Sequence, residues 1–192
     1  MYERGITMAK VYIFLADGFE EIEGLTVVDL LRRAGIEISM VSITGKRKVT
    51  GAHQIAVEAD LLFEDSDYGD ADLLVLPGGM PGTLHLMEHE GLDKLLREFY
   101  SKKKPLAAIC AAPTIFSQKG FLNGIKATCY SGMEDQLTGA NVVDLPVVTD
   151  RTITTSKGLG TAIDFALSII KDIKGETEAR SIAKQILYKH YK

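Results

Sequence analysis

Two kinds of apolar pattern alternate along the chain. Continuous apolar runs, as in strands buried on both faces, occur at residues 10–16, 36–43, 72–76 and 105–110, with shorter ones near 127–130 and 152–155. Apolar residues every three or four positions, which predict amphipathic helices, occur at residues 20–33, 92–103, 113–118, 161–173 and 176–188. Because parallel strands need crossovers and right-handed crossovers place helices over both faces, this alternation predicts an α/β fold with a mostly parallel central sheet.

One segment departs from the alternation. Residues 44–60 contain the polar run Thr-Gly-Lys-Arg-Lys and an alternating stretch near 55–57, which favours a small antiparallel hairpin. No repeat, low-complexity stretch or linker interrupts the rest, and 46% of the 192 residues are apolar, enough for one substantial core. We therefore predict a single domain over residues 8–192, preceded by a disordered leader at residues 1–7.

Composition excludes several classes of partner. The formal net charge is -4, with acidic and basic residues interspersed, so no basic face for nucleic acid is expected. No apolar run approaches the roughly 20 residues of a membrane-spanning helix, and residues 1–7 lack the apolar stretch of a secretory signal. The cysteines, Cys110 and Cys129, lack the spacing of a zinc site or redox pair, which suits a cytoplasmic protein without a structural disulfide.

The residues that follow the predicted strands are the place to look for chemistry. Ligands of open parallel sheets bind beyond the carboxyl ends of the strands. Three such segments carry reactive or conformationally special residues, namely 17–23, 77–82 and 110–113. Because parallel strands end at the same edge of the sheet, we expect these three segments to meet there.

Cys110 ends one of these strands. Its neighbours Ala107, Ala108, Ala111 and Ala112 are small enough to let the backbone reverse sharply into a helix. The free amides and partial positive charge of a helix start favour a thiolate, so we expect a pKa below the ordinary value of about 8.5. The pattern indicates a nucleophile or an oxidation-sensitive sulfur, and the alternative is a buried cysteine that packs as a small apolar group.

Glycines and acids lie at the same edge. Gly78 and Gly79 allow a backbone to approach a ligand and point amides at an oxyanion, although a diglycine is as often a plain turn and no nucleotide motif follows it. Glu20, Glu21 and Glu23 open a helix, where the helix dipole favours carboxylates. A carboxyl group buried beside the sulfur could instead hold a proton and act as general acid or base, but spacing alone does not select one.

Four histidines are further candidates. His85 and His89 are four residues apart and could share one helical face as half of a metal site. The sequence suggests no third ligand, so a solvated surface pair is favoured and no metal is expected. His190 lies in the terminal tail, whereas His53 follows a Thr-Gly-Ala turn in the predicted hairpin and could reach the pocket.

With these segments assembled, the chain resembles the ThiJ/PfpI superfamily, and most closely its protein deglycase branch, which contains the Parkinson-disease protein. The similarity runs nearly end to end. It rests on Glu-Glu-Ile-Glu at residues 20–23, Val-Asp-Leu-Leu-Arg-Arg-Ala-Gly at 28–35, Leu-Pro-Gly-Gly at 76–79 and Ala-Ala-Ile-Cys-Ala-Ala-Pro at 107–113. The resemblance implies a flavodoxin-like three-layer α/β/α sandwich and a homodimer.

The resemblance also implies roles for single residues. Cys110 matches the family's reactive cysteine on a nucleophile elbow, and Glu23 matches the carboxylic acid that hydrogen-bonds this sulfur. The amides of Gly79 and Ala111 match the groups that cradle an oxyanion or an oxidised sulfur. Gly78 belongs to the same pocket motif.

Three pocket positions depart from related sequences. Tyr130 aligns where the deglycase branch often has a histidine, and His53 aligns near the pocket arginine of some members. Ala111 stands where protease-like members have a histidine, which removes the obvious base of a Cys-His hydrolase.

The implied activity is cofactor-independent and metal-independent conversion of reactive carbonyls. The substrate would be a small aldehyde such as methylglyoxal, converted to lactate, or an early glycation adduct. In such a reaction the Cys110 thiolate attacks the aldehyde carbon, and Glu23 moves protons until water releases the product. A non-enzymatic redox sensor or redox-regulated chaperone is an alternative, and a PfpI-like cysteine peptidase or amidase is a weaker one.

Overall fold

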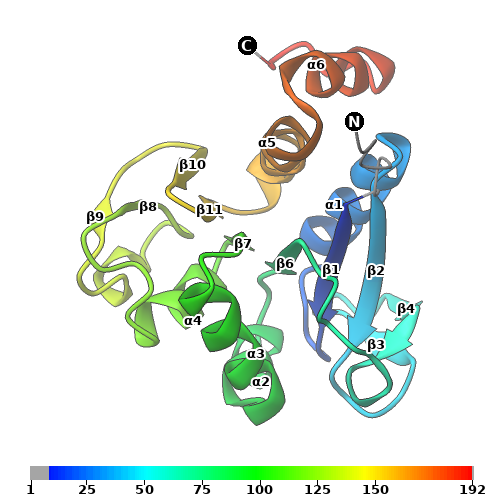
Figure 1. Ribbon diagram of the computed structural model, residues 1–192, viewed down its shortest axis with the longest axis vertical. Helices are drawn as coiled ribbons and strands as arrows, with labels where there is room; N and C mark the ends of the chain where they lie inside the picture. Colours follow the sequence, from blue (N-terminus) through cyan, green and yellow to red (C-terminus); the bar gives the residue numbers. More distant parts are fainter. Residues whose placement is uncertain (1–8, 192) are drawn as a thin grey trace, which may run out of the picture.

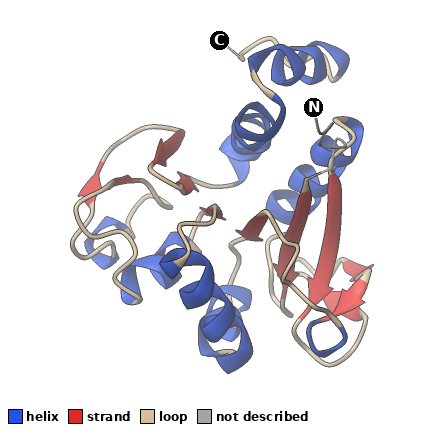
Figure 2. Ribbon diagram, in the orientation of Figure 1, coloured by secondary structure: helices blue, strands red, loops and turns tan. Residues whose placement is uncertain are grey.

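A seven-stranded sheet forms the centre of the computed structural model, which describes residues 9–191. Its strands run in the order β10-β11-β7-β6-β1-β2-β5, and all neighbours are parallel except β10 and β11 (Figures 1 and 2). Their bounds are β1 (Lys10–Leu15), β2 (Glu37–Ser42), β5 (Leu61–Leu62), β6 (Leu73–Leu76), β7 (Leu106–Ile109), β10 (Val147–Asp150) and β11 (Ile153–Ser156).

Helices cover both faces of this sheet. Along β1, Ile13 packs with the helices of one face and Phe14 with those of the other, because successive strand residues point to opposite sides. One face carries α1 (Glu21–Arg33), α5 (Ala162–Lys174) and α6 (Glu176–Gln185), and the other carries α2 (Gly82–Glu88), α3 (Glu90–Ser101) and α4 (Pro113–Gln118) (Figure 1). The predicted α/β fold with a mostly parallel sheet is confirmed.

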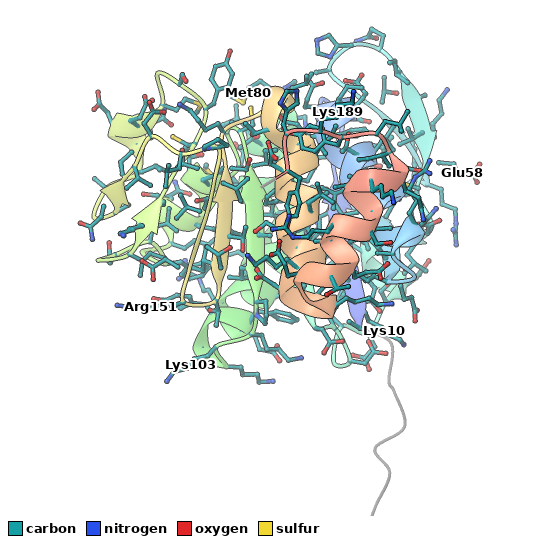
Figure 3. All side chains as sticks on the ribbon, turned by 90° about the horizontal axis from the view of Figure 1, so that it is seen from above. Lys10, Glu58, Met80, Lys103, Arg151 and Lys189 are labelled. Atoms are coloured by element: carbon teal, nitrogen blue, oxygen red, sulfur yellow. The ribbon has the colours of Figure 1, made fainter. Side chains whose placement is uncertain are left out.

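The sheet has a topological switch point between β1 and β6. The chain leaves β1 for α1 on one face and leaves β6 for α2 on the other, and ligands of open parallel sheets usually bind beyond the carboxyl ends of the strands at such a point. Met80, just past β6, lies at this end of the molecule, and Lys10, Lys103 and Arg151 lie at the opposite end (Figure 3). Any ligand site of the usual kind for this topology therefore lies on the Met80 side.

Several smaller elements complete the fold. The predicted hairpin in residues 44–60 is confirmed as an antiparallel pair, β3 (Lys48–Thr50) and β4 (Ala56–Glu58). Helix α2 and strand β10 have no counterpart among the predicted elements. Short 3-10 turns lie at residues 63–65, 134–136 and 159–161.

The strand predicted at residues 127–130 is wrong in extent. Only Lys126–Ala127 is extended, as β8, and it pairs with β9 (Asn141–Val142) outside the main sheet. The following residues are held by single hydrogen bonds instead of a ladder, since the Thr128 amide donates to Thr155 Oγ1 and the Tyr130 amide donates to the Cys110 carbonyl.

The leader predicted at residues 1–7 lies outside the described part of the chain. Across residues 9–191, every helix is too short or too polar to cross a bilayer.

Candidate functional site

Three loops meet at the carboxyl edge of the sheet, as the sequence predicts. Glu23 lies in the first turn of α1, Gly78 follows β6, and Cys110 follows β7. The Gly78 amide donates a hydrogen bond of 2.9 Å to Glu23 Oε2, and the Gly78 carbonyl accepts one of 2.8 Å from the Glu20 amide. The β6 loop is therefore bound directly to the start of α1.

Cys110 occupies a tight elbow between β7 and α4. Its φ angle is +66°, a left-handed conformation that costs a non-glycine residue free energy and that recurs at functional sites. Hydrogen bonds hold the strained residue on both sides, since its amide donates to the Ser156 carbonyl at 2.9 Å and its carbonyl accepts from the Tyr130 amide at 2.8 Å. The amides of Gly79 and Ala111 both point at its sulfur.

Glu23 is the acid that faces this sulfur. Glu23 is 1% exposed, and its carboxyl group accepts hydrogen bonds from the amides of Gly78 and Leu159. Burial disfavours the charged form and raises the pKa of Glu23 to about 7, although hydrogen bonds from Cys110 and the amides oppose this rise. A carboxyl group with a pKa near neutrality can both accept and return a proton at physiological pH.

The lowered thiol pKa expected from the sequence is wrong. Burial and the adjacent negative charge of Glu23 raise the pKa of Cys110, and the amides of Ala111 and Gly79 only partly offset them. Helix α4 begins at Pro113 with Ala112 as its N-cap, so the thiol precedes the helix and gains little from its dipole. The two groups form one coupled acid, whose first proton is lost near pH 7 and leaves a single negative charge in the pair.

Gly78 is the point of closest approach between these groups. A Cβ atom at this position would lie 2.6 Å from Cys110 Cβ, 2.7 Å from Glu23 Oε2 and 3.1 Å from Cys110 Sγ. All three distances are shorter than ordinary van der Waals contacts. Only glycine allows the β6 loop, the acid and the thiol to occupy this space together.

Replacing Gly78 with alanine should therefore distort the site. The added methyl group forces Cys110 and Glu23 apart, so we expect thiol alkylation by iodoacetamide to slow about tenfold or more. Overpacking should cost about 1–3 kcal/mol of stability and lower the Tm by roughly 2–10 °C, measured by calorimetry. Gly160→Ala is the matched control, since a Cβ there meets no atom within 4 Å, and equal behaviour of the two variants would contradict the interpretation.

Gly158 completes the site and was not identified as a site residue from the sequence. A Cβ at Gly158 would lie 3.8 Å from Cys110 Sγ, 3.6 Å from Glu23 Oε1 and 3.4 Å from Tyr130 Cδ2. The strand rule could have found this residue, because Ser156 ends β11 at the same edge of the sheet. The missing side chain at Gly158 leaves a gap bordered by the sulfur, the Glu23 carboxyl group and the Tyr130 ring.

His53 is not brought to the thiol. Its Nδ1 lies 2.9 Å from Glu21 Oε2 and 3.3 Å from Glu20 Oε2, and its amide donates to Glu21 Oε1. Hydrogen bonding to Glu21 raises the pKa of His53, so the contact has the character of an ion pair. Within the described chain, Glu20, Glu21 and His53 are also the one group of three or more histidine, cysteine or acidic residues whose potential metal-binding atoms lie within 4.8 Å of one another.

The contacts of His85, His89 and Cys129 do not form a reactive site. His85 and His89 do not share a helix, because α2 ends at Glu88 and His89 caps α3 by accepting the Leu92 amide. Cys129 is buried, and burial raises its pKa to about 11. Both the burial and the raised pKa of Cys129 disfavour its reactive thiolate form.

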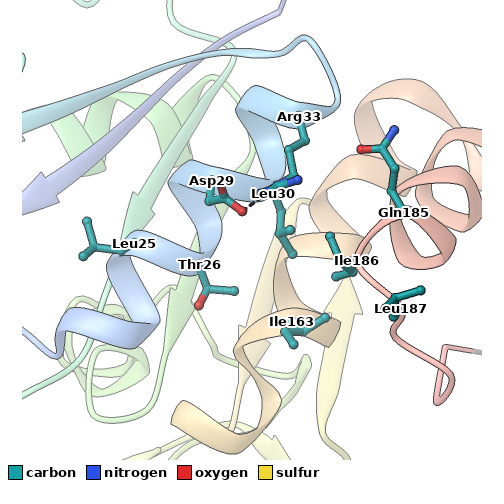
Figure 4. A pocket seen from close by; sticks show the side chains of 9 residues that line it. All are labelled: Leu25, Thr26, Asp29, Leu30, Arg33, Ile163, Gln185, Ile186 and Leu187. Atoms are coloured by element: carbon teal, nitrogen blue, oxygen red, sulfur yellow. Dashed lines mark hydrogen bonds and ion pairs between the residues drawn. The ribbon is translucent and has the colours of Figure 1, made fainter.

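A hollow lies on the surface of the helical layer, away from the thiol. It measures about 630 Å³ and is formed between α1, α5 and the end of α6 (Figure 4). Its lining contains neither Cys110 nor Glu23. The residues around it are Leu25, Thr26, Asp29, Leu30, Arg33, Ile163, Gln185, Ile186 and Leu187.

Comparison with known sequences gives consistent matches over most of the chain. The model of the DJ-1/PfpI family matches residues 9–172. The Parkinson disease protein 7 homolog of Danio rerio is 30% identical over 184 residues, which cover 94% of this chain and 97% of that one. A deglycase of Pyrococcus abyssi (strain GE5 / Orsay) is 33% identical over 168 residues, covering 86% and 99%. The chain spans only 41% of one plant relative, Protein DJ-1 homolog B of Arabidopsis thaliana.

A solved structure agrees with the sequence matches. Oxidized DJ-1 of Toxoplasma gondii superposes with a TM-score of 0.91 at 33% identity, covering 95% of this chain and all of that one. The resemblance drawn from the four motifs is confirmed.

Proposed function

This chain belongs to the DJ-1/PfpI family, and from that membership we propose that it is a cysteine-dependent, cofactor-independent enzyme acting on small reactive carbonyls. The observation that carries the proposal is the convergence of Cys110, Glu23 and the amides of Gly79 and Ala111. These supply a nucleophile, a proton carrier and oxyanion donors at one point.

The first step is general-base catalysis. The raised pKa of Cys110 means that the sulfur is protected by its proton until a base removes it, and Glu23 is positioned to be that base. As Glu23 takes the proton, the sulfur attacks the aldehyde carbon of a 2-oxoaldehyde such as methylglyoxal. The amides of Gly79 and Ala111 stabilise the oxygen on which negative charge develops, and a hemithioacetal results.

The remaining steps need no external oxidant or reductant. Glu23 transfers a proton from the carbon bearing the sulfur to the neighbouring carbon, so the former aldehyde carbon is oxidised while the ketone carbon is reduced. The product is a thioester of Cys110. Water then cleaves the carbon–sulfur bond, releases lactate and restores the thiol, so the overall change is addition of one water to methylglyoxal.

An early glycation adduct is a second substrate of the same chemistry. The hemithioacetal or hemiaminal that methylglyoxal forms with a protein side chain releases free aldehyde, which the same thiol can attack. The deglycase name of the archaeal relative agrees with this extension.

Oxidation of Cys110 is a second candidate function. The amides of Gly79 and Ala111 that favour an oxyanion would equally hold the oxygens of a sulfinate, and protonated Glu23 would hydrogen-bond to them. Redox sensing would then use the same residues without turnover. Peptidase activity has less support, because His53 contacts Glu21 and Ala111 follows the cysteine.

A homodimer is part of the proposal, with the hollow between α1, α5 and α6 as the interface. Leu187 at its rim is 81% exposed, and Asp29 and Arg33 form a 2.7 Å ion pair along the same lining. In a two-fold interface this pair is self-complementary between copies. Sedimentation should give twice the 21.0 kDa chain mass, and Leu187→Asp, but not Leu145→Asp, should yield monomer.

The direct test measures lactate from methylglyoxal. The purified protein, without glutathione, should form lactate in proportion to enzyme concentration, and D- and L-lactate assays should detect it. Sulfinate formation at Cys110 under dilute peroxide can be measured by mass spectrometry. Rapid sulfinate formation without any lactate would contradict the enzymatic proposal and favour redox sensing.

A further inference from the structure

Two large exposed apolar side chains belong to the loops that carry the site. Tyr130 is 54% exposed and Met80 is 52% exposed. Single exposed apolar residues are common on protein surfaces, so exposure alone carries little meaning. The position of these two residues in the backbone is more informative than their exposure. The Tyr130 amide donates to the Cys110 carbonyl, and Met80 directly follows Gly79, whose amide faces the sulfur.

The ring of Tyr130 borders the gap that Gly158 leaves beside the thiol. A Cβ atom added at Gly158 would lie 3.4 Å from Tyr130 Cδ2 and 3.8 Å from Cys110 Sγ. No side chain fills that space, since residue 158 is glycine. A group attached to the reacting carbonyl would therefore extend from the sulfur along the tyrosine ring.

We propose that Tyr130 and Met80 form an apolar subsite that selects 2-oxoaldehydes with an aromatic or large aliphatic substituent over methylglyoxal. The inference rests on the proposed function of Cys110. A phenyl group can pack against the Tyr130 ring and the flexible Met80 thioether, whereas the methyl group of methylglyoxal reaches little of this surface. Tyr130 and Met80 act on specificity and take no part in proton transfer.

The experiment compares phenylglyoxal, which would yield mandelate, with methylglyoxal, which would yield lactate. The two aldehydes differ in intrinsic reactivity, so the informative quantity is the ratio of their kcat/KM values in each variant. We expect this ratio to fall about tenfold in Tyr130→Ala and severalfold in Met80→Ala, chiefly through a higher KM for phenylglyoxal. Tyr130→Phe should keep the wild-type ratio because it keeps the ring.

Tyr100→Ala is the matched control. Tyr100 is also an exposed tyrosine, 38% accessible, but it lies near the end of α3, at the far end of β7 from the thiol. Its removal should leave the ratio unchanged. An unchanged ratio in both Tyr130→Ala and Met80→Ala would overturn the proposal.

A second measurement separates this inference from the proposed function. Cys110 can be alkylated by 2-bromoacetophenone or by bromoacetone, and the ratio of these rates needs no turnover. A ratio that falls in Tyr130→Ala supports the subsite even if neither aldehyde is converted, an outcome that would contradict only the enzymatic proposal. Turnover of both aldehydes with a ratio unchanged in both Tyr130→Ala and Met80→Ala would instead contradict only the subsite.

Discussion

Cys110→Ser is expected to lose methylglyoxal conversion by about 10³-fold or more. The hydroxyl group would remain on the elbow, but it is a far weaker acid than a thiol, and Glu23 with a pKa of about 7 is too weak a base to remove its proton. The measurement is lactate release at saturating methylglyoxal. Residual activity within tenfold of wild type would show that the reaction does not pass through the sulfur.

Cys129→Ser is the control for this variant. Cys129 is the other cysteine of the chain and is buried, with its sulfur directed to the Tyr130 carbonyl. The substitution should leave the rate of lactate release within about twofold of wild type. It should also leave the thiol reactivity of Cys110 unchanged, measured by peptide mapping after limited alkylation.

Glu23→Gln is expected to reduce kcat/KM by about 10²–10⁴-fold, the range typical for loss of a positioned acid–base group. Glutamine keeps the size of the side chain and can still accept the Gly78 amide, so the loss reports proton transfer more than packing. A matched change, Glu20→Gln, alters a neighbouring carboxylate that contacts His53 and should have little effect. Equal losses in the two variants would contradict the role of Glu23.

The pH dependence of alkylation and turnover tests the coupling of Cys110 and Glu23 independently. Glu23 accepts the thiol proton only when ionised, so wild-type alkylation and turnover should rise as the pH increases through about 7 and fall away below it. In Glu23→Gln the rise in rate near pH 7 should disappear. The thiol should then titrate at a lower pKa than in the charged wild-type pair, because the carboxylate that raises it is gone. Iodoacetamide rates from pH 5 to 10 measure both effects.

The sheet could be predicted because its strands are buried on both faces. Ile13 and Phe14 pack into opposite cores, so β1 appears in the sequence as an unbroken apolar run. Helix α2 is short and follows a Gly-Gly-Met-Pro segment, which contains residues typical of turns. The apolar segment around Cys129 was predicted as a strand but is a loop. Cys129 is buried there by individual loop contacts and not by a strand ladder.

The position of the site followed from topology, but its chemistry did not. Parallel strands ending at one edge bring Cys110 and Gly78 together, whereas selection of Glu23 over its neighbours depended on family resemblance. The thiol pKa was predicted in the wrong direction, because burial and a facing carboxylate outweigh a helix start that lies beyond the sulfur. Such balances depend on distances that a sequence pattern does not contain.

The hydrogen bond from the Cys110 amide to the Ser156 carbonyl links the reactive elbow to a late part of the chain. During synthesis, the elbow would leave the ribosome well before its restraining strand β11 and before Gly158. Until those residues dock, the hydrogen bond from the Cys110 amide is missing, and nothing from β11 holds Cys110 in its left-handed conformation beside Glu23. The coupling between the thiol and Glu23 is therefore established only at the end of folding, after the last strand of the sheet has been synthesised.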